Sequence, residues 1–269
     1  MDLQLKGLKA IVTGGTKGIG LAIAQTLARE GASVAICSRD AHAAGQTAES
    51  LSAMSGTEAL GAGVDVADGA TLKQWVEDVA KQWGGLDIVV ANVSALSISN
   101  DIESWRKQFE TDMLGTVNLV DAAMPYLEAS KAGSIVAISS VSGREVDFAA
   151  GPYGTFKAAL VHYVQGLAYQ LAPKGIRANT VSPGNVYFKG GVWDWIEINN
   201  PTLYAEALAL NPTKRMATPQ DRKCGCVHCE PHCEFCQRHE SRGRRRADSR
   251  RTAMSRDSFR TVRNKQGLR

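Results

Sequence analysis

The sequence predicts an α/β fold, in which helices cover both faces of a doubly wound parallel sheet and so form three layers. Two observations support this prediction. Short apolar runs alternate with segments of helical spacing as far as residue 182, and a glycine-rich turn separates the first run from the first helical segment. Residues 1–221 can bury one sizeable core, so we expect them to form one domain.

The apolar runs predict six strands, one of which closes at Asp65-Val66, and the helical spacing predicts five helices between them. The expected strands are residues 9–13, 33–37, 86–91, 133–139 and 176–182 together with the one that closes at 65–66, and the expected helices are 21–28, 41–53, 69–83, 101–129 and 152–173. Ligands bind outside the carboxyl ends of parallel strands. The segments that follow the strands should therefore converge on one edge of the sheet.

The glycine turn has the context of a dinucleotide-binding site. The apolar run Lys9–Thr13 is followed by Gly14-Gly-Thr-Lys-Gly18-Ile-Gly20 and then by helical spacing. Glycines let the backbone approach a pyrophosphate, and a helix N-terminus offers free N–H groups with a partial positive charge. We therefore expect this turn to bind a dinucleotide cofactor.

Two side chains at the end of the second strand, Ser38 and Arg39, favour NADP(H) over NAD(H). An acidic side chain there would accept hydrogen bonds from an adenosine 2′-hydroxyl, whereas an arginine suits a 2′-phosphate. Lys17 adds a second positive charge nearby. The alternative is that Arg39 is only a solvated side chain after a strand.

Tyr153 and Lys157 stand four residues apart on an expected helix, and Ser140 lies thirteen positions before Tyr153. A phenol, whose pKa is ordinarily ~10, exchanges protons poorly at neutral pH. A lysine at i+4 lies on the same helix face and places a positive charge that favours phenolate. A serine hydroxyl can then hydrogen-bond the substrate oxygen. These three residues suit general acid/base chemistry on a C–OH/C=O pair.

In this order and spacing the segments resemble those of the short-chain dehydrogenase/reductase family over about residues 7 to 221. The resemblance implies a Rossmann-type fold, an NAD(P)H-dependent oxidoreductase activity, and a small carbonyl or alcohol as the substrate. Among relatives, the chain looks most like the 3-oxoacyl-[acyl-carrier-protein] reductases, which makes a β-keto thioester the first substrate hypothesis. The cofactor contacts it implies are Gly14, Thr16, Lys17, Gly18, Ile19, Gly20, Ser38, Arg39, Asp65, Val66, Asn92, Tyr153, Lys157, Pro183, Gly184 and Val186.

By the same resemblance, Tyr153 is the acid/base, Lys157 assists it and holds the ribose, and Ser140 orients the substrate oxygen. Asp112 is the fourth catalytic candidate, and it departs from the family because most relatives have an asparagine there. An Asp would partly neutralise Lys157, or it is a helix residue with no catalytic role. The alternative function is therefore a nucleotide-binding but catalytically impaired protein with a binding or regulatory role.

Residues 187–212 are the expected substrate loop, because relatives have a mobile lid at this point. Its apolar side chains either contact the substrate or merely cover the core. They are Phe188, Val192, Trp193, Trp195, Ile196, Leu203 and Tyr204. No run of ~20 apolar residues predicts a transmembrane helix, and no signal-peptide pattern begins the chain, so we expect a cytoplasmic enzyme without a membrane partner.

The composition changes abruptly at residue 222. The segment 222–269 has five of the six cysteines and 14 Lys and Arg against 5 Asp and Glu, whereas the remainder has 17 against 22. A zinc module and a basic nucleic-acid-binding tail are two interpretations. Only three residues separate Cys226-x2-Cys229 from Cys233-x2-Cys236, which is short for wrapping a metal. We therefore predict neither a metal nor a nucleic acid as a partner.

The third and favoured interpretation is that residues 222–269 are read out of frame. A reading frame shifted by one nucleotide permits a sequence that resembles the family's usual ending, including its last strand. We therefore expect this strand to be missing or replaced, and the charged tail to be disordered. The homo-oligomer that relatives form is in doubt for this chain, because their contacts commonly use this region.

Overall fold

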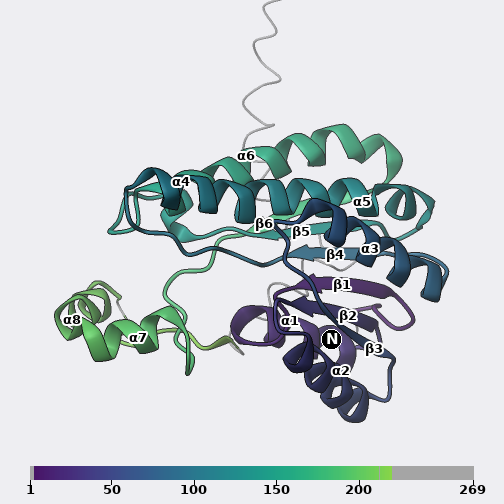
Figure 1. Cartoon of the computed structure of the whole chain (residues 1–269), viewed down its shortest axis with the longest axis horizontal. Coiled ribbons are helices and arrows are strands. Elements are labelled where there is room, and N and C mark those ends of the chain that lie inside the picture. Colours follow the sequence, from purple (N-terminus) through teal and green to yellow (C-terminus); the bar gives the residue numbers. More distant parts are fainter. Residues whose placement is uncertain (1–2, 212, 220–269) are drawn as a thin grey trace, which may run out of the picture. The chain divides into compact units, whose positions relative to one another are not determined.

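The computed structural model describes residues 3–211 and 213–219, and Figure 1 shows how their elements are arranged. The tail from residue 222, with the predictions made for it, lies outside these residues. Six parallel strands form one sheet in the order β3-β2-β1-β4-β5-β6. The strands are β1 (Lys9–Thr13), β2 (Ser33–Ser38), β3 (Ala59–Gly63), β4 (Ile88–Ala91), β5 (Ser134–Ile138) and β6 (Arg177–Val181).

Helices follow the strands as the sequence predicts, and two more form after β6. They are α1 (Gly18–Arg29), α2 (Ala41–Ser55), α3 (Gly69–Trp83), α4 (Ile102–Gln108), α5 (Gly115–Ala129), α6 (Pro152–Leu171), α7 (Val192–Asn199) and α8 (Pro201–Leu210). A π-helix, η1 (Phe109–Leu114), and two 3₁₀ turns, η2 (Val141–Gly143) and η3 (Ala172–Lys174), complete the described elements. None of the helices in this described part is long and apolar enough to span a membrane.

The sheet has apolar layers on both faces because successive strand residues point to opposite sides. On β1, Ile11 packs into a cluster with α3, α5 and α6, whereas Ala10 and Val12 pack into a second cluster with α1 and α2. The doubly wound α/β prediction is therefore confirmed, and the strand ends meet at one edge. Within the described residues, β6 is an edge strand with a partly exposed surface.

Two local predictions were wrong in their boundaries. The expected third strand ends at Gly63 rather than at Val66, because Asp65 starts a turn in which its side chain accepts from the Ala67 N–H at 3.0 Å. The expected helix 101–129 is divided into α4, η1 and α5. The wider π turn lets Gln108 and Asp112 accept hydrogen bonds from the Ser97 and Ala95 N–H groups at 2.9 and 2.8 Å.

Candidate active site

Lys157 lies at the centre of the site and is almost fully buried on α6. Its Nζ donates to the carbonyl of Ile138, the last residue of β5, at 2.9 Å. The backbone carbonyl of Lys157 accepts from the Ser139 hydroxyl at 2.7 Å. The helix is thus held to the carboxyl end of β5 by both the side chain and the backbone of this lysine.

Asp112 is the second polar partner of Lys157. Its Oδ2 lies 2.9 Å from Lys157 Nζ, and both side chains are at most 2% exposed. Its Oδ1 accepts from the Ala95 N–H at 2.8 Å. The carboxylate therefore pairs directly with the lysine. Asp112 and Lys157 together form a buried ion pair beside the end of β5.

Tyr153 lies one turn before Lys157, on the same face of α6. Lys157 Nζ is 5.7 Å from the centroid of the Tyr153 ring. Pro152 occupies the first turn of α6, where its missing N–H is not needed, and the Gly154 N–H donates to the Ala149 carbonyl at 2.9 Å. The structure brings the phenol and the ammonium together, as their spacing predicts.

Ser140 follows β5 and precedes η2. Its buried hydroxyl accepts from the Ser142 N–H at 3.2 Å. A Cβ on Gly143 would lie 2.6 Å from the backbone carbon of Lys157, so η2 packs directly on α6 and needs a glycine there. This close packing, next to the contact of Ser139 with Lys157, places Ser140 at the same end of β5 as the ion pair.

The glycine turn is held by hydrogen bonds from the next strand along. Asn92, which follows β4, donates through its amide nitrogen to the carbonyls of Thr13 and Gly14 at 3.0 and 3.2 Å, and its backbone N–H donates to the Thr13 hydroxyl at 3.0 Å. Gly14 and Gly18 have φ values of +67° and +58°, which favour glycine. A Cβ on Gly20 would lie 2.2 Å from the Gly14 carbonyl oxygen.

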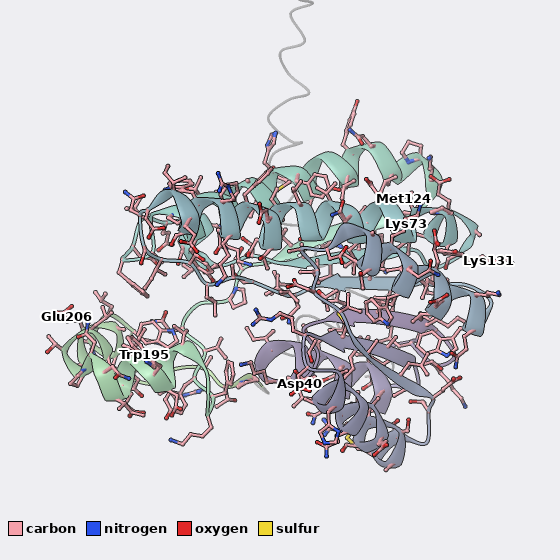
Figure 2. All side chains as sticks on the ribbon, in the orientation of Figure 1. Asp40, Lys73, Met124, Lys131, Trp195 and Glu206 are labelled. Carbon is pink, nitrogen blue, oxygen red and sulfur yellow. The ribbon has the colours of Figure 1, made fainter. Side chains whose placement is uncertain are left out.

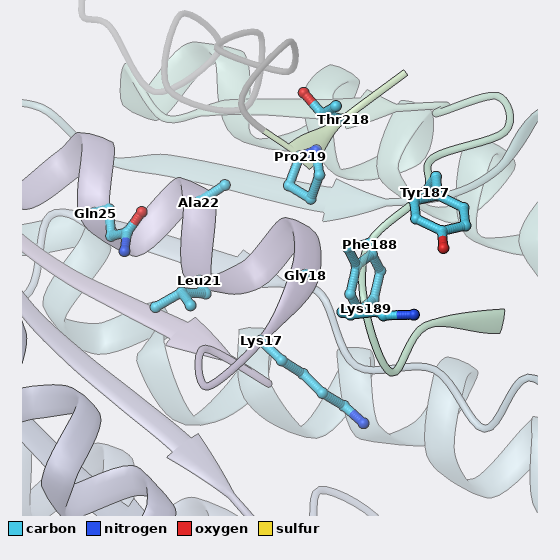
Figure 3. A pocket seen from close by; sticks show the side chains of 10 residues that line it. All are labelled: Lys17, Gly18, Leu21, Ala22, Gln25, Tyr187, Phe188, Lys189, Thr218 and Pro219. Carbon is cyan, nitrogen blue, oxygen red and sulfur yellow. The ribbon is translucent and has the colours of Figure 1, made fainter. Parts of the chain in front are cut away.

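The N-terminus of α1 is suited to an anionic ligand, because no side chain caps its first N–H groups. Phe188 lies against it: a Cβ on Gly18 would approach the Phe188 ring to 2.5 Å. Figure 3 shows this ring beside Gly18, at a cavity of about 350 Å³ that contains no catalytic candidate. Its lining residues are Lys17, Gly18, Leu21, Ala22, Gln25, Tyr187, Phe188, Lys189, Thr218 and Pro219.

The remaining predicted cofactor contacts lie at the same edge of the sheet. Ser38 is the last residue of β2, and Arg39, which follows it, is exposed. Beneath the turn, burial raises the pKa of the Cys37 thiol to about 12. Val66 is buried, with Thr16 and Ile19 half-buried at the turn.

The segment after β6 joins the site to α7. Val141 N–H donates to the Pro183 carbonyl at 2.9 Å, which places Pro183 and Gly184 next to the residue after Ser140. Val186 pairs with Ala217 in an isolated parallel bridge. Pro183 and Gly184 thus lie beside the turn that follows β5, and Val186 leads into the expected substrate loop.

The expected substrate loop is largely helical and has a small core of its own. Trp193 and Ile196 of α7 pack with Ala207 of α8 and with Met216, whereas Trp195, labelled in Figure 2, is 60% exposed. The Phe148 ring meets Trp193 edge to face, with centroids 5.7 Å apart. Part of this segment thus packs on itself, whereas Trp193 contacts the loop that precedes α6 and Phe188 contacts the glycine turn.

Sequence reasoning did not single out Thr13, Ser142 or Asp147. Thr13 links the glycine turn to Asn92, and Ser142 donates to Asp147 at 2.6 Å. Ser142 stands two residues after Ser140, a spacing typical of a serine turn, and this signal could have identified it. Nothing in the local pattern indicates that Asp147 folds back on Ser142.

The comparisons with known proteins agree with this geometry. The family described as short chain dehydrogenase matches residues 8–190, which is more than half of the chain. Isoepoxydon dehydrogenase patN of Penicillium expansum is 38% identical over 222 residues, covering 81% of this chain and 85% of that protein. The chain belongs to the short-chain dehydrogenase/reductase family and is an oxidoreductase that interconverts a carbonyl and an alcohol.

Two solved structures resemble the fold closely. L-sorbose reductase from Gluconobacter frateurii, complexed with NADPH and L-sorbose, has a TM-score of 0.79 and 28% identity, covering 87% of this chain and 94% of its own. A 7α-hydroxysteroid dehydrogenase complexed with NADH and 7-oxo glycochenodeoxycholic acid has a TM-score of 0.79 and 27% identity, covering 86% of this chain and 90% of its own. Similar proteins thus bind either nicotinamide cofactor.

Proposed function

We propose that this protein is an NADP(H)-dependent reductase or dehydrogenase in which Tyr153 exchanges the proton of the substrate oxygen. The observation that supports this most is the buried lysine 5.7 Å from the Tyr153 ring, at the strand end that Ser140 follows. The cofactor supplies or accepts the hydride. Tyr153 holds the proton at its phenol oxygen, Lys157 stabilises the phenolate, and Ser140 orients the substrate oxygen by a hydrogen bond.

The glycine turn and the end of β2 fit the cofactor. Gly14, Gly18 and Gly20 leave the backbone of the turn open where a Cβ would collide or strain it, and the first N–H groups of α1 have no side-chain cap. Exposed Arg39 and Lys17 would hold a 2′-phosphate by charge-assisted hydrogen bonds. This pair of cations supports the choice of NADP(H).

The cofactor proposal is tested by the affinities for NADPH and NADH of the Arg39→Ala variant. Losing one charge-assisted hydrogen bond should weaken NADPH binding by about 10- to 100-fold and leave NADH binding nearly unchanged. Arg29→Ala, which removes an exposed arginine at the far end of α1, is the matched control. Tighter NADH than NADPH binding by the unaltered chain would overturn the proposal.

For the substrate, we propose 3-oxoacyl thioesters as the first class to assay, and cyclic ketones and ketoses as the second. The second class is motivated by the isoepoxydon dehydrogenase and sorbose reductase relatives. The rates of NADPH oxidation with a panel of 3-oxoacyl thioesters, cyclic ketones and ketoses distinguish the two substrate classes. Tyr153→Phe should abolish turnover while the cofactor still binds, and a variant that keeps full activity would refute the assigned acid/base.

A second candidate function, binding without turnover, is favoured by one observation. The Asp112 carboxylate lies 2.9 Å from Lys157 Nζ and compensates the charge that would assist Tyr153. NADPH binding without oxidation of any substrate in the panel would support this alternative.

A further inference from the structure

Three side chains form a hydrogen-bonded chain that leads away from Ser140. Ser140 Oγ donates to Ser142 Oγ at 3.3 Å, and Ser142 Oγ donates to Asp147 Oδ2 at 2.6 Å. The other oxygen of Asp147 accepts from the Ala149 N–H at 2.9 Å. The chain is therefore anchored by one carboxylate that binds two donors.

Counting hydrogens fixes the direction of this chain. An ionised carboxylate only accepts, so the single hydrogen of Ser142 is used toward Asp147, and Ser142 Oγ can only accept from Ser140. Ser140 Oγ in turn accepts from the Ser142 N–H at 3.2 Å. The Ser140 hydrogen therefore makes only a long bond to Ser142, which a substrate oxygen can replace at little loss.

Asp147 also connects the two ends of the loop that separates Ser140 from Tyr153. Its hydrogen bond to Ser142 holds the turn after β5. At the other end of the loop it accepts from the Ala149 N–H, and the carbonyl of Ala149 accepts from the Gly154 N–H at 2.9 Å. Gly154 is the neighbour of Tyr153. The short bond between Ser142 and Asp147 is of the charge-assisted kind, which is stronger than a neutral one.

We propose that Asp147 is a positioning residue for the reaction. By keeping the Ser142 hydroxyl as an acceptor, it fixes the Ser140 side chain and leaves the Ser140 hydrogen as the one that turns to the substrate oxygen. This inference rests on the proposed role of Ser140 and adds to it a residue that acts through Ser142 without touching the substrate.

The test is a double-mutant cycle in the full chain. Ser142→Ala and Asp147→Ala should each lower kcat by about tenfold or more, because the donor is no longer held in place, and both should leave the Kd for NADPH unchanged. The double variant should lose no more than the worse single variant. Ser142→Thr, which keeps the hydroxyl, should retain nearly full kcat.

An additive double variant would overturn the proposal, because Asp147 would then act only by binding the Ala149 N–H. Asp147→Asn sharpens the test: Ser142 and Ala149 donate to different oxygens of the carboxylate, and an asparagine puts an NH₂ group in place of one of them, so it should not restore kcat. Full turnover by Ser140→Ala would refute the proposed function itself. An inactive Ser140→Ala together with a fully active Asp147→Ala would refute this inference alone.

Thermal melting gives a readout that does not depend on activity. If Ser142 and Asp147 are coupled, the double variant should melt within about 1 °C of the lower single variant. Independent decreases in Tm that add together would contradict the coupling even if no substrate were turned over.

Discussion

Replacing Asp112 by asparagine removes the carboxylate that neutralises Lys157. The aspartate has one oxygen for the Ala95 N–H, at 2.8 Å, and the other for Lys157 Nζ, at 2.9 Å. An asparagine has one oxygen and one NH₂ group, so one of these two donors must face another donor. The buried lysine would keep its bond to the Ile138 carbonyl at 2.9 Å.

The size of the effect follows from the geometry. Loss of one partner from a buried pair costs about 3–5 kcal/mol, and the bond that remains to Ile138 places this variant near 3 kcal/mol, or roughly 6–12 °C in Tm. Lys157 Nζ lies 5.7 Å from the centroid of the Tyr153 ring and 2.9 Å from Asp112 Oδ2, so Asp112 Oδ2 lies within about 9 Å of that centroid. At that range a unit charge is worth ~2 kcal/mol in a medium of effective dielectric constant ~20.

Removing the negative charge therefore favours the phenolate of Tyr153. The acid limb of the kcat profile for alcohol oxidation should move to lower pH. Glu110→Gln, at an exposed position in the same π-helix, is the control for the change in net charge. If Asp112→Asn left the profile where it was, Asp112 would play no part in catalysis.

Two further predictions concern the glycine turn and α7. Gly20→Ala should abolish NADPH binding and lower Tm, since its Cβ would lie 2.2 Å from the Gly14 carbonyl, whereas Gly45→Ala, with free space around its Cβ, should raise stability by about 0.5–1 kcal/mol. Asp194→Ala should increase trypsin cleavage at Lys189 at pH 7. The Gly190 N–H and Lys189 lower the pKa of Asp194 to about 2. In the unaltered chain, acid should therefore weaken the contacts of Asp194 with Gly190 and Lys189 only as the pH falls from about 4 toward 2.

The sequence predicted the layers of the fold because the strand periodicity leaves little choice. The central residues of β1 and all four residues of β4 are apolar and buried on both faces, and a strand buried on both faces must be covered by helices on both sides. The π-helix was not predictable in this way. It is accompanied by a tertiary hydrogen bond, from the Ala95 N–H to Asp112, between residues that are seventeen apart in the sequence.

For the site, the sequence predicted the helix face and the sheet edge on which the candidates lie but not what each one binds. The four-residue spacing of Tyr153 and Lys157 fixes a common helix face, and the strand ends fix a common edge. The direct contact of Asp112 with Lys157, and the fold of the loop that brings Asp147 to Ser142, depend on side-chain packing between elements. No local pattern specifies such contacts.

The frame-shift prediction concerns residues outside the described part of the chain and is tested on the gene. Independent sequencing of codons 218–224 should show a missing or extra nucleotide. An intact frame in a gene with a functional product would refute it.

Phe188 gives a last prediction, on access to the glycine turn. Its ring lies against Gly18 at the N-terminus of α1, so close that a Cβ there would approach it to 2.5 Å (Figure 3). A pyrophosphate that uses the N–H groups of this helix end must approach the same surface, and the ring must then move aside. An equilibrium that favours the covered state lowers the apparent affinity by the fraction of chains that are open.

Phe188→Ala should therefore bind NADPH more tightly and faster, by a fewfold, with the greater gain in the association rate. Phe109→Ala, which removes a partly exposed ring that packs on Phe156 of α6, should leave both quantities unchanged. Stopped-flow fluorescence of the bound nicotinamide measures the two rates. Weaker binding by Phe188→Ala would mean that the ring supports the cofactor instead of covering its site, and the apolar side chain would then belong to the binding surface.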